Sequence, residues 1–227
     1  MEALLEFYLN PRNDLGGQTV AFFNLCFAPI ALSILIGVGI GILVYRSALM
    51  SFIAVNLSNL LRAVPVLAAL FIFVPIFKVG FLPAAVALTL LGIPPVLLNT
   101  YVGLRGIDPA SIDAARGMGM TSAQILVRVQ APLVLPVIAA GVRTCAVQVV
   151  ATAPLGGLIG AGGYGEYIVD GVNRLDTVEI LAGALLVAIL AMLIEVGMNA
   201  AERRLTPPGL RPGKAKRPRV SVRPASV

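Results

Sequence analysis

Charge is scarce in this sequence. Only 12% of its 227 residues are charged, while hydrophobic residues make up 58% and the mean hydropathy is +0.94. A soluble domain carries roughly 25% charged residues. The chain has too little charge to cover a water-exposed surface, so we expect an integral membrane protein with an all-α fold.

Histidine and tryptophan are absent, and only two cysteines occur. Without His, the chain cannot form imidazole zinc sites or Ser-His-Asp triads, and we predict no metal site and no catalytic residue. Cys26 and Cys145 lie far apart in apolar stretches, where we expect buried small hydrophobic side chains. The first residues carry Glu2 and Glu6 and no basic cluster, so no cleavable signal peptide is expected. The aromatic residues are scattered, and no cage for a cation is visible.

About five transmembrane helices are predicted from the apolar stretches of the chain. The spans are expected at about 20–44, 63–77, 81–104, 132–155 and 178–200, inside a membrane domain covering 20–204. Pro65 predicts a break near Arg62–Pro65. Gly37 and Gly41 permit a close helix contact, which does not by itself indicate a dimer face. Segment 1–19 precedes the first span, and the basic, Pro-rich tail 205–227 is expected to be disordered.

The basic residues predict the orientation in the membrane. With the 106–130 loop and the tail in the cytoplasm, only Arg12, Lys78 and Arg174 of the 17 basic residues lie outside. Cytoplasmic loops carry the excess of Lys and Arg. The N-terminus is therefore expected outside and the C-terminus in the cytoplasm of a multi-pass protein.

The 106–130 loop predicts two short helices joined by a glycine turn. Asp108 before Pro109 is typical of a helix start, and Gly117 with Gly119 is expected to end that helix. Thr121 and Gln124 match a capping box for a second helix, which Pro132 is expected to limit. Such a loop can simply pack on its own membrane domain. A DNA-reading helix pair looks similar, but the flanking spans argue against nucleic acid.

The same loop resembles the EAA loop of ABC importer permeases. That pattern is Glu-Ala-Ala, three residues, Gly, nine residues and Ile-x-Leu-Pro. It is matched in spacing by Asp113-Ala114-Ala115, Gly119 and Val129-Gln130-Ala131-Pro132. Asp replaces Glu, Val replaces Ile, and Ala131 loses the bulk of Leu. The resemblance implies that Asp113, Ala114, Ala115, Gly117, Gly119, Ile125, Val129 and Pro132 couple the chain to an ATPase.

Further segments are similar to permeases for osmoprotectants such as glycine betaine, choline, carnitine and proline betaine. They are Arg62-Ala-Val-Pro-Val-Leu, Ile93-Pro-Pro-Val-Leu-Leu-Asn-Thr-Tyr, Asp113-Ala-Ala-Arg-Gly-Met-Gly-Met and Leu158-Ile-Gly-Ala-Gly-Gly-Tyr-Gly. The resemblance implies a cell-membrane transport subunit that is not an enzyme. Its implied partners are an ABC ATPase, a second permease chain (identical or a paralogue), an extracytoplasmic solute-binding protein and membrane lipid.

The sequence contains no phosphate-binding loop of its own. The Gly-Lys pair Gly213-Lys214 is followed by Ala215 instead of Ser or Thr. Gly160, Gly162 and Gly165 match a dinucleotide fingerprint, but they follow a membrane span and not a strand, so we regard the match as false. No cofactor is expected, and ATP is expected to bind the partner subunit.

Polar residues and glycines within the spans and their ends are candidates for the transport pathway or its gate. They are Arg62, Pro65, Asn99, Arg143, Gln148, Thr152, Gly160, Gly162 and Gly163. Arg143 is favoured as a structural or gating partner, because an arginine would repel a cationic substrate. Glu195 is expected either to neutralise an arginine or to lie solvated at the interface. The 156–165 stretch predicts either a re-entrant part of an external gate or a simple connection.

Other functions remain open at this stage. Within the same class, the alternative is a permease for amino acids or methionine. A small channel or half of a secondary transporter would need ion sites or internal repeats, and neither is visible in the sequence.

Overall fold

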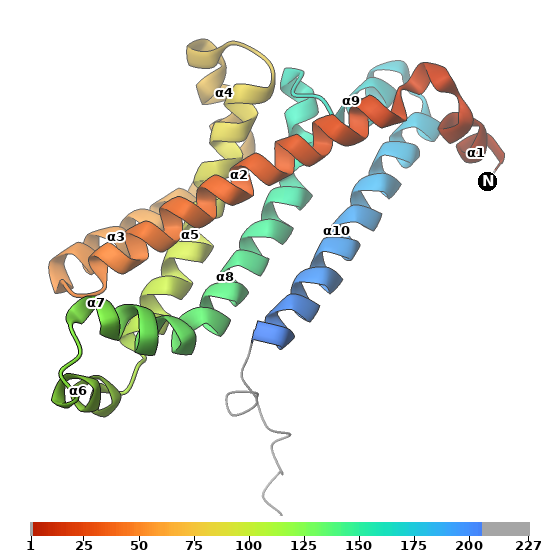
Figure 1. Cartoon of the computed structure of the whole chain (residues 1–227). Helices are drawn as coiled ribbons and strands as arrows, with labels where there is room; N and C mark the ends of the chain where they lie inside the picture. The colour runs from red at the N-terminus through yellow and green to blue at the C-terminus, as the bar shows by residue number, and fades with distance from the viewer. Residues whose placement is uncertain (1, 206–227) are drawn as a thin grey trace, which may run out of the picture.

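The structure is a computed structural model that describes residues 2–205. All regular secondary structure in this part of the chain is helical (Figure 1). The elements are α1 (Glu2–Leu9), η1 (Pro11–Asn13), α2 (Leu15–Val44), α3 (Ala48–Ala63), α4 (Val66–Phe77), α5 (Phe81–Arg105), α6 (Pro109–Gly117), α7 (Ser122–Ile125), η2 (Leu126–Gln130), α8 (Ala131–Thr152), η3 (Ala153–Ile159), α9 (Tyr164–Arg174) and α10 (Thr177–Leu205). No strand occurs within these residues, which confirms the all-α prediction. The prediction for the tail lies outside the described residues.

Four helical stretches are long and apolar enough to cross a membrane. They are Pro11–Val44, Phe81–Arg105, Ser122–Ile159 and Thr177–Glu202. The pair α3 and α4 also qualifies, but it is bent by 94° at its break. The total is therefore five spans if this bent pair crosses once, in agreement with the predicted number.

The break between α3 and α4 has a local cause. Val64 is extended (ψ 122°), and Pro65, which lacks an N–H, stands as the N-cap of α4. The predicted span 63–77 corresponds to α4, which has only 12 residues and measures about 18 Å. Because the hydrocarbon core is about 30 Å thick, α4 alone is too short to cross it.

Helix α5 forms the centre of the molecule. It packs against α2, α3, α4 and α8. Of its most apolar stretch 72% is buried, compared with 11% of the corresponding stretch of α10. Gly37 and Gly41 of α2 allow this contact: a Cβ at these positions would lie 2.8 Å from Val96 Cβ and 2.7 Å from Thr100 Cβ. The glycine pair therefore serves a contact within the chain.

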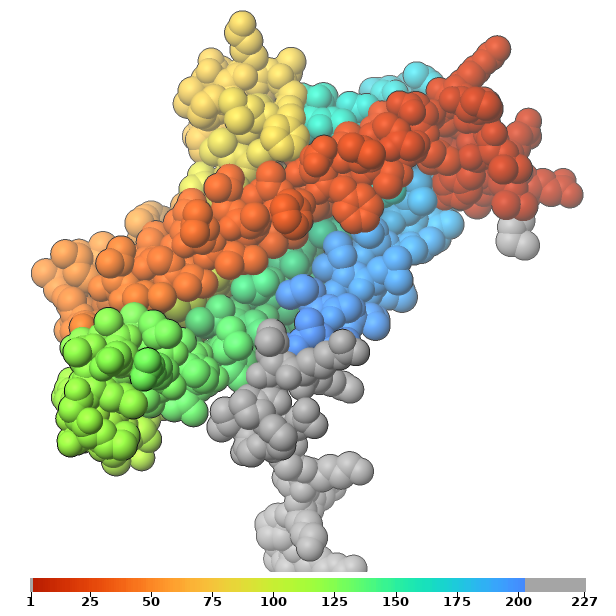
Figure 2. Space-filling view, in the orientation of Figure 1, coloured from red at the N-terminus to blue at the C-terminus, as the bar shows by residue number. Residues whose placement is uncertain are grey.

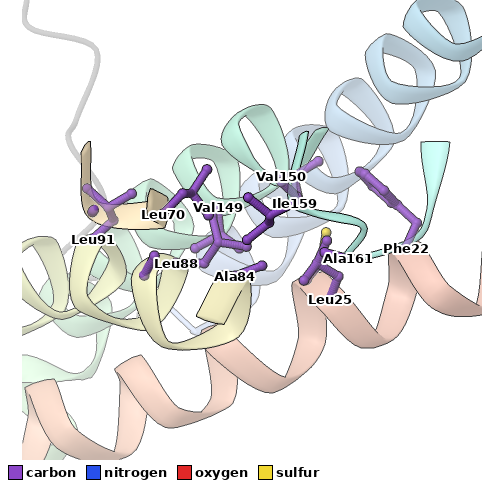
Figure 3. Close-up of a cluster of buried hydrophobic side chains, with 14 of the residues drawn as sticks. Phe22, Leu25, Leu70, Ala84, Leu88, Leu91, Val149, Val150, Ile159 and Ala161 are labelled. Carbon is purple, nitrogen blue, oxygen red and sulfur yellow. The ribbon is translucent and has the colours of Figure 1, made fainter. Parts of the chain in front are cut away.

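The largest buried cluster joins α2, α4, α5, α8 and the segment after α8 (Figure 3). Phe22, Leu25, Leu88 and Val149 have no exposed surface, and Leu70 of α4 packs into the same cluster. Both cysteines are buried and free, as predicted; Cys26 and Cys145 are members of this cluster.

Two short helices were missed by the sequence analysis. Helix α1 lies in the predicted 1–19 segment and contacts α10, where the Tyr8 hydroxyl donates to the Ala182 carbonyl (3.0 Å). Helix α9 follows the glycine-rich stretch and packs against α10. Both lie at the end of the molecule opposite α6 and α7 (Figure 1).

Candidate coupling loop and transport pathway

Gly119 ends the first helix of the loop. Asp108 Oδ1 accepts from the Ala110 N–H (3.0 Å) at the start of α6. At its end, Gly119 has a φ of +80°, and the Met120 N–H donates to the Ala115 carbonyl (3.2 Å). Gly117 was expected to end this helix together with Gly119, but it is the last residue of α6, with no positive φ. The left-handed turn thus depends on Gly119 alone.

The second loop helix begins with the predicted capping box. The Gln124 N–H donates to Thr121 Oγ1 (3.3 Å), and the Thr121 N–H donates to Gln124 Oε1 (2.9 Å). The expected end at Pro132 is wrong, because α7 continues through the π-helix η2 into α8 without a break. Pro132 has no N–H, and its ring crowds the Arg128 carbonyl. The wider turns of η2 give that carbonyl room.

Buried side chains fix the loop to the membrane helices. Ala115 of α6 and Ile125 of α7 are almost fully buried, and so is Gln130 at the end of η2. The Tyr45 hydroxyl at the end of α2 donates to Gln130 Oε1 (3.2 Å) and accepts from Arg46 Nε (2.7 Å). The sequence gave no signal for this link, because its partners lie 85 residues apart.

The opposite face of α6 is open to solvent. Asp113, Ala114 and Gly117 are exposed, and Met118 is 71% exposed. Asp113 forms an ion pair with Arg116 (3.4 Å), and both side chains are exposed, so the pair contributes little to stability. Of the remaining predicted coupling residues, Val129 is half-buried and Pro132 exposed. The space-filling view shows the loop as a lobe projecting from one end of the helical body (Figure 2).

Arg143 forms an ion pair with Glu202 and not with Glu195, the acid considered from the sequence. Its guanidinium lies 3.4 Å from Glu202 Oε2, so the ion pair joins α8 to α10. Glu195 is exposed and in no ion pair with a described residue. The position of Arg143 therefore fits the structural role favoured above.

Three further pathway candidates make local helix contacts. Asn99 Nδ2 donates to the Pro95 carbonyl (2.8 Å), and the Thr152 hydroxyl donates to the Gln148 carbonyl (2.7 Å). Asn99 also lies at a close contact between α5 and α8, since a Cβ on Gly141 would stand 2.7 Å from its Cβ. The side chains of Asn99 and Thr152 thus bond to the backbone of their own helices, while Gln148 contributes only its carbonyl, and their role in a pathway stays a prediction.

Arg62 and Pro65 lie at the bend between α3 and α4. Both are exposed, and so are Asn56 and Asn59 on the preceding turns of α3. A polar face on a membrane-spanning segment usually faces water or a partner helix, because lipid cannot solvate it. The exposed side chains near the bend thus include four with polar groups or a proline, Asn56, Asn59, Arg62 and Pro65.

The glycine-rich stretch is a short ordered connection. Helix η3 follows α8 directly, and Gly160, Gly162 and Gly163 then adopt φ values of +66°, +83° and +83°. The Gly163 N–H donates to Gln18 Oε1 (2.6 Å), and Gln18 Nε2 donates to Glu166 Oε2 (2.8 Å). Gln18 of α2 therefore holds both sides of the turn, a role that sequence reasoning missed.

Helix α9 packs at the end of the molecule opposite the loop and is linked there to the N-terminal segment. Burial raises the pKa of the Tyr167 phenol to about 12, helped by nearby acidic groups. The protonated hydroxyl donates to the Asn13 carbonyl and so connects α9 to the N-terminal segment. A signal for α9 existed in the spacing of Tyr164, Tyr167, Ile168 and Gly171 on one helical face.

Long apolar helices and a capped helical loop that projects beyond them define a multi-pass membrane protein. Residues 33–207 match the family described as "Binding-protein-dependent transport system inner membrane component". The chain belongs to this family, and it is therefore a permease subunit of a transport system.

Characterised relatives match nearly the whole chain. The carnitine transport permease protein OpuCB of Listeria monocytogenes is 39% identical over 93% of this chain and 97% of its own. The choline transport system permease protein OpuBB of Bacillus subtilis (strain 168) is 34% identical over 92% of this chain and 97% of its own.

Solved structures share the fold. The inward-facing MetNI methionine ABC transporter matches with a TM-score of 0.73 and 23% identity, covering 85% of this chain and 96% of that one. At this identity the likeness establishes the fold alone.

Proposed function

We propose that the chain is the membrane-spanning subunit of an ABC importer for osmoprotectants: glycine betaine, choline, carnitine or proline betaine. The support for this substrate class is the 39% and 34% identity, over more than nine-tenths of the chain, to permeases named for carnitine and choline. The alternative class, amino acids or methionine, has support from structures at 24% identity or less.

The loop geometry supports a mechanical role in this importer. A separate ATPase subunit hydrolyses ATP, and the exposed face of α6 with Asp113, Ala114 and Met118 docks on it. The capping groups at Asp108 and Thr121, the turn at Gly119 and the buried anchor at Ile125 keep the helix pair rigid. A rigid loop transmits the displacement of the ATPase to the spans. The transporter can then switch between its two conformations as rigid bodies.

The other partners follow from the same proposal. An extracytoplasmic binding protein delivers the solute, and a second permease chain completes the pathway. In our orientation, α6 and α7 lie in the cytoplasm, while α1 and α9 lie outside. The polar bend at Arg62 faces the second chain. No cofactor is bound by this chain, and ATP is bound by the ATPase.

Uptake by the reconstituted importer tests the proposal. The chain would be combined in proteoliposomes with the ATPase and binding protein of its own transport system, and ATP-dependent uptake of labelled carnitine, choline and glycine betaine would be compared with methionine. We expect uptake of at least one quaternary amine and none of methionine. Uptake of methionine alone would contradict the substrate class and leave the family assignment intact.

A further inference from the structure

A cavity lined by three arginines lies between the loop and the ends of α2 and α5. Its volume is about 370 Å³, and Arg46, Arg105 and Arg116 share it with Ser122 and the Tyr45–Gln130 pair. No acidic residue is among the residues that line it. The cavity thus gathers positive charge at the level where two spans end.

The charges in this cavity are poorly balanced within the described chain. Arg116 has Asp113 as a partner at 3.4 Å, while Arg46 and Arg105 form no ion pair with a described residue. Each of these two guanidiniums lies over a tyrosine ring, Arg46 at 5.3 Å from that of Tyr45 and Arg105 at 5.9 Å from that of Tyr101. The Nε–H of Arg46 donates to the Tyr45 hydroxyl, and the remaining guanidinium N–H groups can donate to the oxygens of a phosphate.

A second cavity shares Arg105 with the first. It has a volume of about 360 Å³ and lies between α3 and α5, lined by Ala48, Phe52 and Val55 together with Ser51, Asn56 and Tyr101. Phe52 is 68% exposed, and Val102, one turn before Arg105, is 59% exposed. A basic pocket therefore adjoins a groove with an apolar side, formed by Ala48, Phe52 and Val55, on the surface of the spans. An anion with hydrocarbon chains fits this pair of cavities better than free phosphate.

We propose that the arginine cavity binds the phosphate of an anionic phospholipid, with one acyl chain along the groove between α3 and α5. The proposal rests on the orientation given above, which places the cavity at the cytoplasmic leaflet, where anionic lipids concentrate next to basic residues. Arg46 and Arg105 bind the phosphate, Ser122 donates a hydrogen bond, and Phe52 and Val55 contact the chain. The bound lipid would add a contact between the coupling loop and α2 and α3, beside the Tyr45–Gln130 hydrogen bond.

Native mass spectrometry of the full-length chain in a neutral detergent tests the site. Phosphatidylglycerol and phosphatidylcholine would be titrated onto wild-type protein, Arg46→Gln, Arg105→Gln and the double variant. The matched control is Arg128→Gln, an exposed arginine of the same loop that does not line the cavity. Ala48→Phe, which fills the groove without changing charge, is the second probe. Size-exclusion chromatography after heating would show that each variant is folded.

We expect tighter binding of phosphatidylglycerol than of phosphatidylcholine, weakened about fivefold by each lost arginine and unchanged in the control. Ala48→Phe should weaken it as well, and millimolar inorganic phosphate should not displace the lipid. Unchanged lipid binding in the double variant would overturn the proposal. So would displacement by phosphate alone, which indicates a free anion site. Because no solute or ATP is used, the outcome is independent of the uptake assay.

Discussion

At the scale of single residues, the turn between α6 and α7 depends on a backbone angle. Gly119 has a φ of +80°, and a Cβ there would meet nothing within 4 Å. The position is therefore open in space but restricted in conformation. Adding a side chain costs backbone strain of roughly 1–2 kcal/mol and causes no steric clash.

Replacing Gly119 should impair coupling. Gly119→Val should lower ATP-dependent uptake and co-purification of the ATPase, because a β-branched residue resists the left-handed turn. Gly119→Asn should be milder, because Asn tolerates this region. Gly197→Ala, at an open position in α10, is the control. Normal uptake and normal ATPase binding by Gly119→Val would refute the role of the turn.

The local chemistry of the loop was predictable, and its long-range contacts were not. Asp108, Gly119 and the Thr121–Gln124 box act within three or four residues, so their types and spacing suffice to predict them. The Gln18–Gly163 bond joins positions 145 residues apart. A single sequence does not indicate such a pair, because neither residue requires the other to be compatible with its local structure.

At the scale of elements, the contact between α2 and α5 carries the packing of the first span. Between helices in lipid, close approach and van der Waals contact replace the hydrophobic effect as the source of stability. Gly37 faces α5, whereas Gly39, two residues further on, has no atom within 4 Å of an added Cβ. One helix thus provides both a sensitive site and its control.

Gly37→Ala should destabilise the protein, and Gly39→Ala should not. The added Cβ at position 37 would lie 2.8 Å from Val96 Cβ, so the helices must separate or Val96 must shift. We expect a cost of about 1–3 kcal/mol, seen as a lower melting temperature of the purified chain in detergent. Equal melting temperatures for the two variants would contradict the packing of α2 on α5.

Among the elements, the long helices were predictable and the short ones at the surface were not. The spans follow from apolar length, and the bend before α4 follows from Pro65. Helices α1 and α9 have 8 and 11 residues, so they are too short to appear as spans, and their stability comes from contacts with α10. The helix end predicted at Pro132 was wrong, because the π-helix η2 just before it lets the helix continue through the proline into α8.

At the scale of the whole molecule, the two ends differ in charge. The end formed by α1 and α9 has more acidic than basic residues. Its acids are Glu2, Glu6, Asp14, Glu166, Asp170, Asp176 and Glu179, and its bases are Arg12, Lys78 and Arg174. The loop end has Arg46, Arg105, Arg116 and Arg128 against Asp108 and Asp113. Only the basic residues bear on the orientation, since Asp and Glu contribute little to it.

Thiol labelling in intact cells measures that orientation. Arg174→Cys should react with an impermeant maleimide added outside, and Arg116→Cys should react only after the membrane is opened. Both native side chains are well exposed, at 68% and 69%. Cys26 and Cys145 are buried and should remain unlabelled. Labelling of Arg116→Cys in sealed cells would reverse the assignment.

The coupling loop is attached differently at its two ends. Residues 106–108 form a short non-helical link to α5, while α7, η2 and α8 are one uninterrupted helix. A displacement of the loop would therefore reach α8 through a continuous helix and α5 only through a non-helical link. The two helices pack together where an added Cβ on Gly141 would lie 2.8 Å from the Pro95 carbonyl oxygen. A movement of α8 relative to α5 would have to change this contact, in which the Asn99 side chain also packs on Gly141.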